Sequence, residues 1–333
     1  MGLGVTAAFL VWAVHGVNLR EVLAGVRAAN PMLILASAGV ATLTFPLRTL
    51  RWRVLLRAAD GGRYPWRPLW DATAIGFMAN NLLPARAGEF ARAWVASRSL
   101  PVRFTTALAS IGVERVFDGL MMLALMAAAI AAPSFPRQAT VGGTPLSRVA
   151  AGVAIAFGVA LFLAFIVALR PGPWLSLLEG VATAVLPARF AARVRSMAEG
   201  MVAGLAALRS PGRFAAVLGW SLALWLVNAA AFALCFRAFH LAVPAEGALL
   251  LQGLIGFGVA IPAAPGFWGV FEYATRLTLQ FYGIGATLAL AYAFAFHLTG
   301  FIPITLLGLD ALSRAHLHLG DLRRAAPPPE PAS

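Results

Sequence analysis

The stretch GFMANNLLPARAGEFARAWVASR, residues 76–98, contains a break in an apolar sequence that decides how the rest of the chain is interpreted. The apolar run that begins near Leu69 ends at Pro84 after about fifteen residues, fewer than the ~20 that an α-helix needs to span a bilayer core. Pro84 lacks a backbone N–H and disfavours helix in the residue before it, while Gly88 frees the chain to turn. Residues 69–98 are therefore predicted to form two half-helices joined at a hinge.

Polar side chains gather around this hinge. Inside a bilayer, irregular backbone and charged side chains are tolerated only where they are buried in protein or line a wet cavity. We therefore expect the hinge to lie at the centre of the protein rather than against lipid. The polar residues concerned are Asn80, Asn81, Arg86, Glu89 and Arg92.

The composition excludes an ordinary soluble domain. Of 333 residues, 60% are hydrophobic and only 12% are charged, which indicates a polytopic membrane protein. The formal net charge is +13, but the cations lie between apolar runs, so anionic lipid head groups are the expected counter-charge and nucleic acid is not. The single Cys235 excludes an intrachain disulfide and a thiolate metal cluster, and we expect no metal and no cofactor.

Apolar runs of membrane length recur along the chain. They predict an all-α polytopic membrane protein with about six full transmembrane helices plus two broken, re-entrant helix pairs. Residues 19–30 add an interfacial helix, because apolar and charged residues alternate there at helical spacing. The predicted spans are residues 2–17, 31–50, 104–132, 149–169, 214–236 and 286–309.

The second broken helix repeats the layout of the first. An apolar half-helix at 247–261 is followed by a hinge with Pro265 and Gly266 and then by a second half that carries Glu272. The loop charges place the first pair on the cytoplasmic side and the second on the outside, which predicts inverted repeats with halves of roughly 31–132 and 213–309. The alternative is that two long helices simply contain proline kinks.

The distribution of arginine predicts the orientation. Residues 48–67, 170–213 and 314–324 hold most of the arginines, so these segments and both termini are expected in the cytoplasm. Within the second segment, an amphipathic helix is expected to lie on the inner leaflet. Residues 1–309 are predicted to form one domain in the inner or plasma membrane, followed by a disordered cytoplasmic tail at 310–333.

Several charged residues within apolar runs are candidate site residues. Glu114 and Asp118 are four positions apart and share a helix face, with Arg115 one step round. They could bind a lipid head group or relay protons, or they could form a neutral cluster with Arg86 or Arg92. Glu272 has the same spacing to Arg276, which allows an internal ion pair as well as a functional role.

Other polar residues have simpler interpretations. His297 is expected to be a hydrogen-bonded core residue, and Asn228 and Gln252 are expected to bridge helices. The chain has no HExxH motif, and the serine at Ser221 lacks the second glycine of a nucleophile motif. We therefore do not expect an enzyme.

Three stretches together carry a resemblance to a known family: residues 76–94, ASIGVERVFDGL at 109–120 and PAAPGFWGVFE at 262–272. They resemble the flippase-like integral membrane family related to the transmembrane part of lysylphosphatidylglycerol synthases, over residues 48–309. The resemblance implies a protein that moves a polar lipid between leaflets. The positions that it marks are Asn80, Asn81, Pro84, Arg86, Gly88, Glu89, Glu114, Arg115, Asp118, Pro265, Gly266 and Glu272.

The resemblance also sets expectations about substrate and mechanism. Few residues follow Leu309, so the soluble aminoacyl-transferase domain of the full synthases is expected to be absent. Similar short members belong to glycolipid or hopanoid pathways, which leaves anionic, polyprenyl and hopanoid lipids as partners, with a homodimer allowed. Arg86 and Arg92 are expected to hold a phosphate between two hinges that meet near the midplane. The alternatives are an intramembrane enzyme on lipid-linked substrates and a non-catalytic scaffold.

Overall fold

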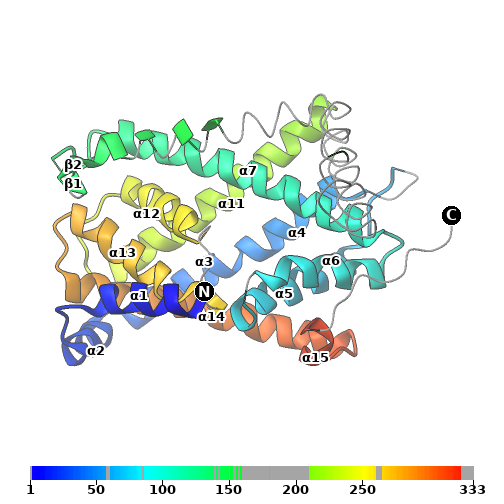
Figure 1. The fold of residues 1–333 in the computed structure, drawn as a ribbon, viewed down its shortest axis with the longest axis horizontal. Helices are drawn as coiled ribbons and strands as arrows, with labels where there is room; N and C mark the ends of the chain where they lie inside the picture. Colours follow the sequence, from blue (N-terminus) through cyan, green and yellow to red (C-terminus); the bar gives the residue numbers. More distant parts are fainter. Residues whose placement is uncertain are drawn as a thin grey trace.

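The computed structural model, shown in Figure 1, is all-α with one short β-hairpin over the residues that it describes. The structure describes residues 2–57, 61–84, 86–138, 140–141, 143–149, 151–152, 155–156, 158–159, 180, 210–259 and 265–323. The helices are α1 (Gly2–Val14), α2 (Leu19–Ala28), α3 (Pro31–Thr42), α4 (Thr44–Leu55), α5 (Trp66–Leu82), α6 (Ala87–Ser99), α7 (Phe104–Ala131), α11 (Pro211–Ala238), α12 (Ala245–Gly258), α13 (Val270–Phe281), α14 (Ala286–Arg314) and α15 (Leu319–Arg323), with a 3-10 turn η2 (Pro265–Phe267). Strands β1 (Thr140–Val141) and β2 (Thr144–Pro145) pair antiparallel in the loop after α7.

Among the residues that the structure describes, three helices are long and apolar enough to cross a membrane: α3 together with α4, α11 and α14. They correspond to three of the predicted spans. Helix α7 has 28 residues, which is about 42 Å at the rise of an α-helix, but it carries three charged residues. The predicted span at 149–169 and the predicted amphipathic helix before residue 210 lie largely outside the described residues.

The N-terminal segment differs from the prediction of a first span over residues 2–17. Helix α1 has only 13 residues, about 20 Å, so by itself it is shorter than the hydrocarbon core. It is followed by a sharp bend of 76° into α2. Asn18 starts α2 by accepting a hydrogen bond from the amide of Arg20, as a helix cap does.

The predicted end of the second span near residue 50 is wrong, because α4 continues to Leu55. Arg48 and Arg51 therefore lie within a helix and not in a cytoplasmic connection. Arg51 is fully buried, as is Trp52 beside it. Arg48, Arg51, Trp52 and Leu55 follow the spacing i, i+3, i+4 and i+7, so they lie on one face of α4.

The first broken helix is a helical hairpin: α5 begins, and α6 ends, at the same end of the molecule. Tyr64, just before α5, donates a hydrogen bond to the carbonyl of Pro101, just after α6, at 3.0 Å. Arg53, near the end of α4, donates to the carbonyl of Tyr64. The predicted break at Pro84 is confirmed.

The second broken helix is also a hairpin, formed by α12 and α13. A Cβ atom on Gly247 in the first turn of α12 would lie 3.2 Å from the ring of Tyr282 at the end of α13. This hairpin begins just after the C-terminal end of α11. That end lies beside the start of α3, because the amide of Asn30 donates a hydrogen bond to the carbonyl of Ala238 at 2.8 Å. The two hairpins therefore enter from opposite ends of the molecule.

The long helices α7 and α14 hold the hairpins between them. In Figure 1, α7 runs along one long edge and α14 along the opposite edge. Helix α7 packs against α6 and α12, while α14 packs against α5 and α13, so each long helix contacts both hairpins. Helix α14 extends past Leu309 to Arg314 and α15 follows, so part of the predicted disordered tail is helical; residues 324–333 lie outside the described residues.

Candidate functional site

The first hinge comprises residues 83–86, between α5 and α6. Leu83 leaves the helix with extended backbone, and Arg86 takes the left-handed conformation at φ 53°, which is uncommon for a residue other than glycine. Asn80 Oδ1 accepts a hydrogen bond from the amide of Gly88 at 2.9 Å. This bond satisfies one of the free amides at the start of α6 and holds its first turn against the last turn of α5.

The two arms of the first hairpin approach closely because small residues face each other. A Cβ atom on Gly88 would overlap the carbonyl oxygen of Gly76 and lie 2.6 Å from Asn80 Oδ1. On its other side, Asn81 donates to the carbonyl of Phe301 at 3.2 Å and to Oγ1 of Thr305 at 3.0 Å, both on α14. The hinge is thus fixed by its own amide side chains, and Pro84 itself is exposed.

The two hinges contact each other through Arg86. Its Nη2 donates to the carbonyl of Val259, which directly follows α12, at 2.5 Å. Its guanidinium also lies 5.7 Å from the ring centre of Phe267 in the second hinge. The sequence-based expectation that the hinges approach each other is confirmed by these contacts.

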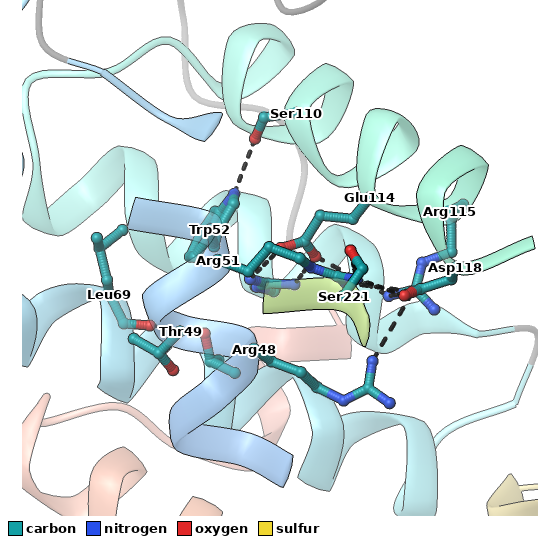
Figure 2. A network of polar contacts seen from close by, with 12 residues as sticks. Arg48, Thr49, Arg51, Trp52, Leu69, Ser110, Glu114, Arg115, Asp118 and Ser221 are labelled. Atoms are coloured by element: carbon teal, nitrogen blue, oxygen red, sulfur yellow. Dashed lines mark hydrogen bonds and ion pairs between the residues drawn. The ribbon is translucent and has the colours of Figure 1, made fainter. Parts of the chain in front are cut away.

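A cluster of charged residues lies beside the first hinge, on α4, α6 and α7, and Figure 2 shows its members on α4 and α7. We call it the charge cluster. The ion pairs that define it range from 2.5 to 4.0 Å. Its members are Arg48, Arg51, Glu89, Arg92, Glu114, Arg115 and Asp118.

The centre of the charge cluster is Arg51, which is fully buried. It donates to both carboxylate oxygens of Asp118, at 2.5 and 3.3 Å, and to Oγ of Ser221 on α11 at 3.0 Å. Trp225 on α11 donates to the same carboxylate at 3.1 Å. Asp118 is therefore a fully hydrogen-bonded anion that joins α4, α7 and α11, which the sequence did not predict.

Arg92 and Glu114 form a second buried pair. Arg92 Nη1 lies 2.6 Å and Nη2 3.4 Å from the two carboxylate oxygens of Glu114. The Arg92 guanidinium lies 3.8 Å from the ring centre of Trp52, whose indole donates to Ser110. Of the two pairings considered from sequence, Arg92 makes the contact to the carboxylates and Arg86 does not, because Arg86 reaches the second hinge.

Arg48 and Arg115 form the rim of the charge cluster. Both approach Oδ2 of Asp118, Arg48 at 3.8 Å and Arg115 at 3.3 Å. Arg115 also lies 3.7 Å from the half-exposed Glu89. Figure 2 shows the two guanidinium groups reaching Asp118 from different sides.

The second hinge is held by a pair of buried residues, Glu272 and His297. Gly266 and Gly269 have positive φ values of 69° and 86°, which favour glycine. Glu272 is fully buried; its Oε2 accepts from the amide of Gly269 at 2.6 Å and its Oε1 lies 2.6 Å from Nδ1 of His297. The other ring nitrogen of His297 lies 2.8 Å from the carbonyl of Gly266. His297 is thus a hydrogen-bonded core residue, as predicted.

The hydrogen bonds of His297 fix the charge of this pair. A neutral imidazole has one donor and one acceptor nitrogen, whereas a carbonyl and a carboxylate both accept. Both contacts are hydrogen bonds only if the pair holds a proton in addition to that of the neutral ring. It is then either an imidazolium with a carboxylate or an imidazole with a carboxylic acid, and in both cases the His297–Glu272 pair is neutral.

The internal ion pair that spacing allows between Glu272 and Arg276 is not the arrangement in the structure, where each residue contacts other partners. Arg276 donates to the carbonyls of Trp12, Ala13 and His15 at the end of α1, between 2.7 and 3.0 Å. It therefore stabilises the C-terminal end of α1, where carbonyls lack helical partners. The predicted bridge between helices is confirmed, since Asn228 donates to Gln252 at 3.2 Å.

Sequence reasoning missed Arg48, Arg51 and Trp225 as members of the site. The two arginines were assigned to a cytoplasmic loop, although their spacing with Trp52 and Leu55 indicates one buried helix face. Among the residues that the structure describes, no group of His, Cys, Asp and Glu side chains is arranged to hold a metal ion.

The comparisons with known proteins place the chain in a family. The family described as Lysylphosphatidylglycerol synthase TM region matches residues 1–308, which is most of the chain. The chain belongs to this family. The match includes both hinges, the charge cluster and the His297–Glu272 pair.

One curated relative matches part of the chain. Glycosyltransferase AglD of Haloferax volcanii is 34% identical over 124 residues, which cover 37% of this chain and 20% of that protein. The chain therefore matches only about a fifth of the length of that relative.

Proposed function

We propose that this protein moves a polar lipid, or assists its movement, between the two leaflets of the membrane. The observation that carries the proposal is that the tips of two helical hairpins, which enter from opposite ends, meet at Arg86 beside the charge cluster. The membership of a family named for a lipid synthase supports a lipid substrate. No covalent step is part of the proposed role.

The proposed mechanism uses two inverted repeats, residues 31–132 and 213–309. The contacts are reciprocal: the first arm of each hairpin packs on the last helix of the other half, and the second arm packs on the last helix of its own half. Inverted repeats with discontinuous helices at their interface are typical of transporters that alternate access by rocking one half against the other. The hinges are the segments at which such rocking would change the contacts.

The charge cluster supplies the physical reason for the proposal. A charged side chain at the centre of a membrane helix costs about 2.5–3.5 kcal/mol on insertion scales, and a polar head group must likewise leave water to cross the bilayer core. A protein path lined with guanidinium and carboxylate groups lowers that barrier while the acyl chains stay in lipid. The buried pairs Arg51–Asp118 and Arg92–Glu114 hold the path in place.

We propose that the arginine-rich end of the molecule faces the cytoplasm. Arg57 lies after α4, and its pKa is lowered by partial burial and by the nearby charges of Arg213, Arg63 and Arg53. The basic ends of α4 and α11 are therefore neighbours, as the positive-inside rule would require. A cysteine introduced by Gly61→Cys or by Gln138→Cys, in addition to the buried Cys235, tests this in cells: position 138 is expected to react with an external impermeant thiol reagent and position 61 is not.

The function is tested in proteoliposomes that contain a lipid with a fluorescent label on one acyl chain. A membrane-impermeant reductant bleaches only the outer leaflet of protein-free vesicles, and the protein is expected to expose the inner leaflet as well. A panel of anionic, zwitterionic and glycosylated head groups identifies the substrate. A folded protein that accelerates none of them would overturn the proposal.

A second candidate follows from the match to a glycosyltransferase: the chain is a membrane module that presents a lipid-linked substrate to a transferase. This role requires lipid binding but no translocation. The proteoliposome assay distinguishes the two, since a protein that binds the labelled lipid without exposing the inner leaflet to the reductant fits the presenting role and not translocation.

A further inference from the structure

The charge cluster contains more positive than negative groups. Its cations are Arg48, Arg51, Arg92 and Arg115, and its anions are Glu89, Glu114 and Asp118. Each arginine keeps its charge in a protein. Among the described residues, the cluster thus has one more positive than negative charge, and Arg86 at the adjacent hinge adds another.

The excess charge falls on the rim and not on the centre. Arg51 and Arg92 each contact both oxygens of a buried carboxylate. Arg48 contacts Asp118 only at 3.8 Å, beyond hydrogen-bond distance. The side chain of Arg48 is only 11% exposed. Its Nε and Nη1 atoms are buried and donate no hydrogen bond to any residue that the structure describes.

The surroundings of Arg48 hold its guanidinium in place without neutralising it. The group lies 4.9 Å from the ring centre of Phe77 and 5.3 Å from that of Trp225. Aromatic faces attract a cation but do not supply an acceptor for its N–H groups. A buried guanidinium with unused donors is costly unless an acceptor reaches it.

We propose that Arg48 and Arg115 together bind the phosphate of an anionic lipid head group, an inference that rests on the proposed function. Both guanidinium groups lie within 4 Å of one oxygen, Oδ2 of Asp118, so they are close enough to bind one phosphate between them. Phosphate oxygens match the donor geometry of arginine, and one negative charge balances the cluster. Arg115 is 36% exposed, which gives the head group access.

This assignment differs from the one expected from sequence. Arg92 has both terminal nitrogens on Glu114 and its face on Trp52, and Arg86 donates to Val259. Arg92 therefore positions Glu114, and Arg86 joins the hinges. The substrate class is a lipid whose head group carries a net negative charge on phosphate, and a lipid that is neutral overall should bind more weakly.

The test measures equilibrium binding to the purified full-length protein in detergent, so it requires no translocation. The probes are short-chain phosphatidylglycerol, short-chain phosphatidylcholine and inorganic phosphate. Arg48→Gln and Arg115→Gln are each expected to weaken binding of phosphatidylglycerol by about tenfold or more, the effect of removing a charge-assisted hydrogen bond. The matched control is Arg98→Gln, which also removes an arginine that lies over a tryptophan but is outside the charge cluster; it should bind like the parent protein.

A thermal melt of each variant separates loss of the site from loss of the fold. Arg48→Gln removes an uncompensated buried charge, so its lipid-free melting temperature is expected to be unchanged or higher, while the stabilisation by phosphatidylglycerol is lost. Equal phosphatidylglycerol binding by parent and Arg48→Gln overturns the proposal. Binding of inorganic phosphate alone, with none of phosphatidylglycerol, overturns the assignment to a lipid.

The failure of this inference is distinct from failure of the proposed function. Binding that depends on Arg48, together with no movement of lipid in proteoliposomes, upholds the phosphate site and overturns translocation. Translocation by a protein whose binding of phosphatidylglycerol does not depend on Arg48 and Arg115 upholds the proposed function and overturns the phosphate site.

Discussion

The two hinges have the same layout but differ in charge. The first hinge lies beside a charge cluster that has an excess of positive groups, and its rim is partly exposed. The second hinge is closed by the neutral His297–Glu272 pair, and the His297 ring centre lies 4.2 Å from that of Trp268 and 4.5 Å from that of Phe271. We infer that the first hinge faces the ligand, whereas the second mainly fixes the shape of its hairpin.

The largest expected effect tests the first side of this comparison. Asp118→Asn removes the carboxylate that Arg51 contacts at 2.5 Å and leaves it, among the described residues, only Glu114, at 3.8 Å, as a counter-charge. Breaking a buried pair in this way costs about 3–5 kcal/mol of unfolding free energy. The measurement is reversible unfolding in detergent. Asp310→Asn is the control, because this residue pairs with Arg314 while 61% of its side chain is exposed, and exposed pairs contribute about 1 kcal/mol or less. Equal losses in the two variants would contradict a buried cluster.

The next effect concerns the close approach of α5 and α6. Gly88→Ala places a methyl group against the carbonyl of Gly76 and the side chain of Asn80, so the arms must separate. We expect a loss on the order of 3 kcal/mol, as for an overpacked core. Gly219→Ala in α11 is the control: no atom lies within 4 Å of its added methyl group, and alanine favours helix by about 1 kcal/mol over glycine. A tolerated Gly88→Ala would show that the hairpin arms are further apart in the folded protein.

The sequence predicted the hinges because their causes are local. Pro84 and Pro265 interrupt apolar runs that are too short to span a membrane, and these signals need no knowledge of distant residues. The charge cluster is different, because Arg51 and Asp118 are 67 positions apart and their contact depends on how α4 packs against α7. Counting Arg51 as a cytoplasmic charge followed the positive-inside rule correctly but ignored the apolar face that it shares with Trp52.

The second hinge shows the same limit in another form. Spacing along one helix suggested Arg276 as the partner of Glu272, whereas the partner is His297, 25 positions away on α14. Arg276 is drawn instead to three free carbonyls at the end of α1, which no local pattern reveals. Helical spacing indicates which residues can pair within one helix, but the packing of neighbouring helices decides which pairs form.

The smallest expected effect is the sharpest test of the difference between the hinges. In Glu272→Gln, the amide oxygen can accept from Gly269 and the amide nitrogen can donate to Nδ1 of His297, whose Nε2 then donates to Gly266. All three hydrogen bonds remain and the pair stays neutral, so the unfolding free energy should change by less than about 1 kcal/mol. Glu272→Leu loses the two hydrogen bonds that the Glu272 side chain makes, to Gly269 and to His297, and is expected to cost about 2–3 kcal/mol.

The same isosteric change in the charge cluster should behave differently. Glu114→Gln removes the charge that balances Arg92, and it is expected to cost about 3–5 kcal/mol, because a buried guanidinium needs an anion and not only an acceptor. The three variants are compared by unfolding in one detergent. If Glu272→Gln were as destabilising as Glu272→Leu, Glu272 would have to act as a charged carboxylate that His297 does not neutralise. The second hinge would then need a counter-charge as the first does, and the distinction between a ligand-facing hinge and a closed one would fail.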